Sequence, residues 1–205
     1  MRFQLNIDKL MFETDGVWDM PLIEATQTTF TGAEEVIPFN YAITERQPQN
    51  KGVHFFLDDY QFERVWTYPE KYGEILKRFK FVLTPDFSLY RNYPKIMQMF
   101  NHYRKQWCGS FFQSLGIDVI ATACWSDEDS FEWCFDGMPQ GTAVALSSVG
   151  TQMNKRAKRL FLAGYEKMKE KLHPRQILFY GQIPEELKKE ELVKIASFTE
   201  ERFRR

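Results

Sequence analysis

Short apolar segments that run directly into a polar cluster, and then into a helical pattern, recur along this chain. They are residues 53–57, 81–84, 117–123 and 142–146. The first three run into acidic clusters that contain Asp58, Asp86 and Asp127, and the fourth runs into the Ser- and Gly-containing stretch 147–151. Because these segments lack alternating polar residues, they are typical of strands covered on both faces of a parallel sheet. Ligands of such sheets bind beyond the carboxyl ends of the strands, so the clusters are candidate site residues.

Helical patterns separate the apolar segments, which is the order expected of repeated βα units. Pro69 and Pro94 suit the first turns of two helices, and a third apolar stripe runs over residues 157–172. A fifth strand is predicted at 176–180. The sequence therefore predicts an α/β fold with a mostly parallel sheet, which is either open and covered on both faces or curled into a partial barrel.

Three regions divide the chain, whose length suits one domain with appendages. Residues 1–50 hold only short extended pieces broken by turn-forming residues, so we expect an irregular N-terminal arm packed on the domain. Residues 51–184 form the α/β core domain. Residues 185–205 are rich in charged side chains, and we expect a charged C-terminal helix there.

Composition excludes several classes of protein. The formal net charge of −1 argues against a dedicated nucleic-acid coat, although a local basic face is compatible with it. Cys108, Cys124 and Cys134 form no Cys-x-x-Cys pair, so we expect buried free thiols in a reducing cytoplasm. The N-terminus lacks a signal-peptide pattern, and no apolar run approaches the ~20 residues of a membrane span. The sequence predicts a cytoplasmic protein without a membrane partner.

Five strings of residues occur in an order that resembles a known family. They are HFFLDDYQFE (54–63), LTPDFSLY (83–90), YRKQW (103–107), WSD (125–127) and FDGMP (135–139). Together they resemble an uncharacterised domain-of-unknown-function family of bacteria, phages and integrating mobile elements, over roughly residues 36–184. The resemblance implies membership and a mobile-element setting, but no activity. The chain departs from the pattern at 121–124, where a Pro-containing strand end is expected.

The acids at the strand ends are the candidate catalytic residues. We expect Asp58, Asp86 and Asp127 to act as acid–base groups, and Asp58 and Asp86 to serve as ligands of Mg²⁺ or Mn²⁺, because carboxylates from neighbouring strand ends offer the oxygen ligands that these ions prefer. The alternative is that the same residues cap the helices that follow them.

Polar side chains after the fourth strand are candidate substrate contacts. Ser147, Ser148 and Thr151 precede a helix, and hydroxyl and amide groups in such a loop can hold an anion. The stretch is not a Walker motif, because no Gly-Lys-Ser/Thr follows. The alternative is an ordinary polar loop.

Further substrate contacts are expected near Asp86 and at the end of the third strand. Ser88 and Arg91 follow Asp86, and Arg91 can pair with phosphate or with Asp86 itself. Trp125 can stack on a base, or it can belong to the core. His54, inside an apolar segment, is expected to be a buried core histidine instead of a base.

Two functions from different classes are compatible with these patterns. The first is an enzyme-like acidic and polar cleft at the strand ends that acts on a nucleotide or nucleic acid. The second is a non-enzymatic protein that binds a host factor, for example in counter-defence or regulation, through the N-terminal arm and the C-terminal helix. The enzyme requires the acids to converge in one pocket, whereas the binding protein predicts scattered acids and an exposed apolar patch.

Overall fold

One parallel sheet organises the molecule. The computed structural model describes residues 11–195, and within them seven strands follow one another in sequence order across the sheet. The strands are β3 (Glu35–Pro38), β4 (Lys51–His54), β5 (Phe81–Leu83), β6 (Val119–Ala123), β7 (Ala143–Ser147), β8 (Gln176–Tyr180) and β9 (Leu192–Ile195). Each neighbouring pair is parallel. The predicted α/β class and the parallel arrangement of the five expected strands are therefore confirmed, although the first of them, expected at 53–57, is observed at Lys51–His54.

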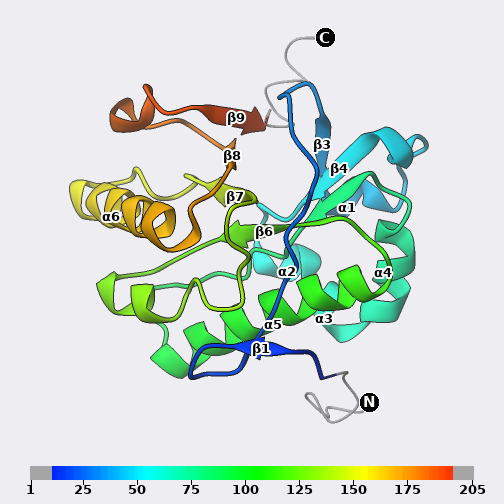
Figure 1. Cartoon of the computed structure of the whole chain (residues 1–205), viewed down its shortest axis with the longest axis horizontal. Coiled ribbons are helices and arrows are strands. Elements are labelled where there is room, and N and C mark those ends of the chain that lie inside the picture. Colours follow the sequence, from blue (N-terminus) through cyan, green and yellow to red (C-terminus); the bar gives the residue numbers. More distant parts are fainter. Residues whose placement is uncertain (1–10, 196–205) are drawn as a thin grey trace.

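The sheet curls toward a barrel, which settles the choice between an open sheet and a partial barrel. Figure 1 shows β3 and β9, the two edge strands, approaching each other at the top of the molecule. Val36 of β3 and Val193 of β9 line one small hollow between these edges. Gly32 lies close enough that a Cβ built on it would be 3.8 Å from a methyl carbon of Val193. In the described part of the chain, side chains and not ladder hydrogen bonds therefore bridge the two edges.

Strand alternation sorts the core into two layers. Residues that face the barrel interior form one apolar cluster, whose buried members are Phe30, Phe81, Leu83, Ile120, Ala143, Ala145, Leu178 and Ile195. The alternate residues face outward and join the larger cluster beneath the helices. The interior is narrow, since a Cβ on Gly52 would lie 2.2 Å from the ring of Phe81. This position therefore needs a residue without a side chain.

Helices cover the outer face of the sheet (Figure 1). They are α1 (Phe39–Ala42), α2 (Asp59–Phe62), α3 (Arg64–Thr67), α4 (Pro69–Leu76), α5 (Lys95–Ser114) and α6 (Lys155–Leu172), with 3₁₀ turns η1 (Pro48–Asn50), η2 (Glu128–Glu132) and η3 (Glu185–Leu187). Pro69 begins α4 and Pro94 immediately precedes α5, as expected. A short antiparallel hairpin, β1 (Thr14–Asp15) and β2 (Met20–Pro21), packs against α5.

The structure differs from the expected division of the chain at two strands. The N-terminal arm contains β3, which pairs with β4 and so belongs to the sheet. The expected C-terminal helix is wrong over the described part of 185–205, because a 3₁₀ turn and β9 stand there, while 196–205 lie outside the described residues. Period-two burial explains β9: Val193 and Ile195 join the barrel interior, and Leu192 packs on the outer core.

The N-terminal arm closes the end of the barrel where the strands begin. Thr26 donates a 2.7 Å hydrogen bond to Asp118, just before β6, and its carbonyl accepts one from Thr142, just before β7. The amide of Phe30 donates to the side chain of Gln176 at the start of β8. The opposite end, where the strands finish, is the end left for a site.

Candidate functional site

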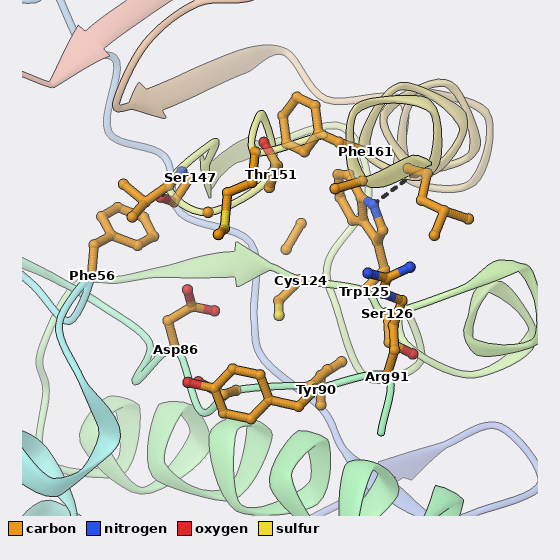
Figure 2. Close-up of a pocket in the computed structure, with 18 of the residues that line it drawn as sticks. Phe56, Asp86, Tyr90, Arg91, Cys124, Trp125, Ser126, Ser147, Thr151 and Phe161 are labelled. Carbon is orange, nitrogen blue, oxygen red and sulfur yellow. Dashed lines mark hydrogen bonds between the residues drawn. The ribbon is translucent and has the colours of Figure 1, made fainter. Parts of the chain in front are cut away.

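A cavity of about 700 Å³ opens at the carboxyl ends of the strands. Its wall is built by the loops after β4, β5, β6 and β7 and by the first turns of α6 (Figure 2). Seven of the residues expected from the sequence lie in this wall. They are Asp58, Asp86, Ser88, Arg91, Trp125, Ser147 and Thr151. Aromatic rings of Phe56, Tyr90 and Phe161 complete the wall, which is therefore polar at a few points and otherwise apolar.

Two expected site residues lie elsewhere. Asp127 precedes η2 and is not part of the cavity wall; its carboxylate lies 3.4 Å from the hydroxyl of Ser126. Ser148 is buried behind the wall and donates a 2.7 Å hydrogen bond to the carbonyl of Gln182. The three acids therefore do not converge, and only Asp58 and Asp86 share the cavity.

The acidic side chains do not assemble a metal-binding group. Within residues 11–195 no set of three or more His, Cys, Asp or Glu side chains is placed to hold a metal ion. Asp58 is exposed, and its carboxylate accepts a long hydrogen bond of 3.4 Å from Gln61. Mg²⁺ and Mn²⁺ favour several oxygen ligands around one point, and two acids alone offer a weak site.

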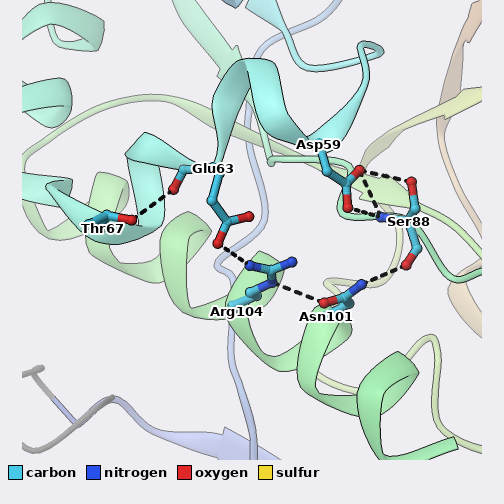
Figure 3. Close-up of polar contacts among 6 residues, drawn as sticks. All are labelled: Asp59, Glu63, Thr67, Ser88, Asn101 and Arg104. Atoms are coloured by element: carbon cyan, nitrogen blue, oxygen red, sulfur yellow. Dashed lines mark hydrogen bonds and ion pairs between the residues drawn. The ribbon is translucent and has the colours of Figure 1, made fainter. Parts of the chain in front are cut away.

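A polar network fixes the loop between β5 and α5, which carries Asp86 (Figure 3). The Asp59 carboxylate accepts hydrogen bonds from the amide and the hydroxyl of Ser88. Asn101 donates to the Ser88 carbonyl at 2.7 Å and accepts from Arg104 at 3.0 Å. Arg104 also pairs with Glu63 at 2.6 Å. Side chains from α2 and α5, together with Glu63 between α2 and α3, thus hold the loop from both sides, which pre-organises any group that it presents.

Asp86 has the most unusual environment in the cavity wall. Its neighbour Phe87 is buried, with the guanidinium of Arg104 3.8 Å from its ring centre. Burial raises the pKa of the Asp86 carboxyl to about 6, with a further rise from Asp59, while Lys105 and a hydrogen bond with Cys124 oppose the rise. One carboxyl oxygen, Oδ1, is enclosed and has no hydrogen-bond partner among the described residues. Near neutral pH this group can therefore both accept and donate a proton.

Trp125 is held against α6. Its indole N–H donates a 3.2 Å hydrogen bond to the carbonyl of Leu160, and its ring stacks on Phe161 with 5.6 Å between ring centres. A Cβ on Gly164 would lie 2.2 Å from the indole nitrogen, so the helix must have glycine there. The ring is thus part of the packing between β6 and α6, and it contributes to the cavity wall from a fixed position.

The loop after β7 uses its own amide groups to form its turn. The amide of Val149 donates to the Ser147 hydroxyl, and the amide of Thr151 donates to the Ser148 carbonyl. The Thr151 hydroxyl donates to that same carbonyl at 2.7 Å. These groups are therefore engaged within the loop, and Arg91 supplies the cationic side chain of the cavity wall.

His54 behaves as the sequence predicts. It is buried beside Tyr180, with 4.8 Å between the ring centres, and its Nδ1 accepts a hydrogen bond from the amide of Phe56. Burial lowers the pKa of the imidazole to about 3. The ring is therefore a neutral core histidine at physiological pH.

Sequence reasoning missed the polar face of α5. Gln98, Asn101, His102 and Lys105 follow the i, i+3, i+4, i+7 spacing of one helix face, and all four are buried. This polar face could have been recognised from the sequence, because the remaining faces of the same helix carry large apolar residues such as Trp107 and Phe111. Gln98 and Asn101 hydrogen-bond to Ser126 and Ser88 of the cavity wall, and the charge of Lys105 acts on Asp86.

Comparison with known proteins confirms the family resemblance. A family model described as a domain of unknown function (DUF4417) matches residues 12–199. The Gene 1 protein of Mycobacterium phage L5 is 38% identical over 183 residues, which cover 85% of this chain and 76% of that protein. The Gene 1 protein of Mycobacterium phage D29 is 46% identical over 131 residues, covering 64% of this chain and 48% of that protein. No solved structure matches the chain.

The same findings bear on setting and partners. Both relatives are phage proteins, in line with the expected phage-associated family. No helix within residues 11–195 has the length and apolar character needed to cross a bilayer. The family match spans most of the chain, so this protein belongs to the family described as a domain of unknown function (DUF4417).

Proposed function

We propose that this protein is an enzyme that binds a nucleoside or nucleotide in the cavity at the strand ends and transfers a proton through Asp86. The observation that carries the proposal is the combination of a ligand-sized, mostly apolar cavity with one half-buried carboxyl group in its wall, whose Oδ1 is enclosed and whose pKa is raised. Perturbed titratable groups in a cavity are typical of functional sites. Asp86 is such a group, on a loop held by a network that spans α2 and α5.

The cavity suits a flat, partly polar ligand. Its volume of about 700 Å³ lies within the range of small-molecule sites, roughly 300–1,000 Å³. Phe56 and Tyr90 present aromatic surface on which a base can stack. Arg91 supplies a cation for a phosphate, and the Ser147 hydroxyl remains able to donate a hydrogen bond. These features support a nucleoside or nucleotide as the ligand class.

The role proposed for Asp86 follows from its ionisation. A general acid or base works best when its pKa lies near the working pH. The pKa of about 6 keeps most of the carboxyl ionised at neutral pH but leaves the protonated form within reach. Asp86 then accepts a proton from a ligand N–H or O–H group and returns it later. Asp58, at the cavity rim, is proposed to contact the ligand without transferring a proton.

The experiment is a thermal-shift and equilibrium-dialysis screen against the common nucleosides and their 5′-monophosphates, with and without Mg²⁺ or Mn²⁺. A ligand at 100 times its dissociation constant stabilises by about 2.7 kcal/mol, which is roughly 5–10 °C for a domain of this size. Asp86→Asn should weaken binding at least tenfold. Asp127→Asn, which removes an acid outside the cavity, should bind as the unmodified protein does. A screen without any hit, or equal binding by both variants, counts against the proposal.

A non-enzymatic function in binding a host protein is the second candidate. One observation favours it: Met11, Val17 and Trp18 are exposed large apolar residues in or beside the N-terminal hairpin. Trp18→Ser should then abolish binding of a host protein while leaving the cavity and its ligands unaffected. If Trp18→Ser changes nothing and a nucleoside binds, the enzyme proposal stands alone.

A further inference from the structure

Lys105 is a buried lysine in the middle of α5. Its side chain is 1% exposed, and its Nζ has no hydrogen-bond partner among the described residues. Fully buried lysines are rare unless a partner compensates their charge. Among residues 11–195 no ion pair with an Asp or Glu side chain at bonding distance involves Lys105. The charge must therefore be compensated at longer range.

Asp86 is the complementary group. Its Oδ1 is likewise enclosed and without a hydrogen-bond partner in the described chain, and its interaction with Lys105 opposes the effect of burial on its pKa. Helix geometry places Lys105 beside the loop after β5, which carries Asp86, because Asn101 and Gly109 lie one turn before and after it on the same face of α5. Asn101 donates to the Ser88 carbonyl, and a Cβ built on Gly109 would lie 2.9 Å from Thr84, so the two contacts fall on either side of Asp86. The free-energy cost of burying a charge falls when a charge of opposite sign lies nearby.

Among the basic side chains near Asp86, Arg104 is paired with Glu63 and Arg91 lies in the cavity wall, whereas Lys105 is the one whose charge lowers the pKa of the Asp86 carboxyl. Burial lowers the pKa of His102 on the same helix face, so its ring is neutral. Burial raises the pKa of the Cys124 and Cys134 thiols, so both stay protonated. Asp59 is an acid and repels a second negative charge. Lys105 is thus the cation of this cluster.

We infer that Lys105 is a positioning residue of the cavity, which supplies the buried counter-charge of Asp86 and acts on a ligand only through that carboxylate. Lys105 lies within YRKQW (103–107), one of the strings that resemble the family, and the inference gives it a role that the string itself does not imply. It rests on the proposed function only where it concerns ligands, because the Asp86–Lys105 pair can be measured on the free protein.

The pair also specifies the ligand group that faces Asp86. With Oδ1 turned into the protein, the cavity is offered the other carboxyl oxygen, which accepts a hydrogen bond. The matching ligand group is an N–H or O–H donor, such as an amide-like N–H of a nucleobase. When that proton moves to the carboxyl oxygen, the ligand keeps the electron pair and becomes an anion. Lys105 acts on this step only through Asp86, because its charge lowers the proton affinity of the carboxylate that accepts the proton.

The first test is a carbon-13 NMR titration of the Asp86 carboxyl in the ligand-free protein. Lys105→Met removes the cation and should raise the midpoint by about one pH unit or more, a tenfold or larger gain in proton affinity. Lys95→Met is the matched control, because Lys95 is an exposed lysine of the same helix that pairs with Asp129; it should leave the midpoint unchanged. A midpoint that Lys105→Met does not move overturns the inference.

The second test is a double-mutant cycle on stability, which also covers a Lys105→Met variant that folds poorly. Asp86→Asn leaves the buried ammonium without its counter-charge and should lower the urea midpoint. The Asp86→Asn/Lys105→Met double variant should recover part of that loss, since neither charge then remains. If the loss of stability in the double variant equals the sum of the losses in the two single variants, Asp86 and Lys105 do not interact and the inference is overturned.

Ligand binding separates this inference from the proposed function. If no nucleoside binds but the titration and the cycle behave as expected, the pair stands and the proposed function fails. If a nucleoside binds through Asp86 but both pair tests give null results, the proposed function stands and Lys105 is only a core residue. Should both hold, Lys105→Met should weaken the ligand at least tenfold, whereas Lys95→Met should not.

Discussion

Burial makes the charge of Asp86 costly, so the stability of the protein is expected to depend on the ionisation of this one side chain. Its pKa rises from 3.8 to about 6 on folding. Between these values the folded protein binds a proton that the unfolded chain has released, so the free energy of unfolding falls as the pH rises through this window. The stabilising contribution of the protonated Asp86 carboxyl is complete below about pH 4 and is lost above about pH 6. A shift of this size corresponds to ~3 kcal/mol at most.

Urea unfolding of the unmodified protein and of Asp86→Asn between pH 4 and pH 7 measures this contribution. As the pH rises, the unfolding free energy of the unmodified protein should fall relative to that of Asp86→Asn, because the aspartate releases its proton and the asparagine does not titrate. Asp127→Asn is the control, since this side chain lies outside the cavity wall. A difference that stays constant over the whole range would show that the carboxyl is solvated.

The same residues show what sequence can and cannot predict about a site. The sequence predicts the positions of Asp58 and Asp86 at strand ends, because a strand ends where its apolar run stops. Asp127 follows the same rule, yet it lies immediately before η2 and is not part of the cavity wall, which on this loop ends at Ser126. Lys105 was missed because its significance depends on a carboxylate nineteen positions away in sequence, on another element. Proximity of that kind exists only in the fold.

At the scale of elements, the contact between α6 and the end of β6 depends on a single missing side chain. Gly164→Ala should destabilise the protein by about 1–3 kcal/mol, because the added methyl group meets the indole of Trp125 at 2.2 Å. Helix propensity alone predicts the opposite sign, a gain of up to ~1 kcal/mol for alanine over glycine. Thermal unfolding decides between the two. In a Trp125→Ala background the clash is relieved, so the same substitution should there be neutral or stabilising.

The elements that were predicted are those with an uninterrupted apolar run. β5 to β8 are buried on both faces, so an apolar run in the local sequence predicts each of these strands without knowledge of its neighbours in the sheet. β3 and β9 are edge strands, and their four residues include Glu35, Pro38 and Lys194. The charged run before β9 resembles a solvated helix. Pairing with β4 and β8 determines these two strands, and such tertiary pairing is not a local property of the sequence.

For the whole molecule, closure of the barrel is expected to rest on β9. This strand is the last of the sheet, and its inward residues Val193 and Ile195 cover the interior cluster between the two edges. A chain that stops at residue 191 loses this cover and exposes the edge of β8, whereas a chain that stops at residue 195 keeps both. The shorter chain should therefore unfold at a lower temperature and aggregate more readily, because an unpaired edge strand recruits other chains.

The two truncations differ by four residues, which makes the comparison sharp. Ile195 is buried, and Leu192 and Val193 are partly buried. Since full burial of one such side chain contributes about 1.5–3 kcal/mol, the difference in unfolding free energy should be at least about 2 kcal/mol. Calorimetry measures that difference, and light scattering measures aggregation. Val193→Asp in the full chain should reproduce much of the loss by placing a charge in the interior, whereas Glu191→Lys, at an exposed position just before the same strand, should cost far less. Equal stability of the two truncated chains would mean that the interior is sealed by the N-terminal arm around Phe30 and not by the last strand.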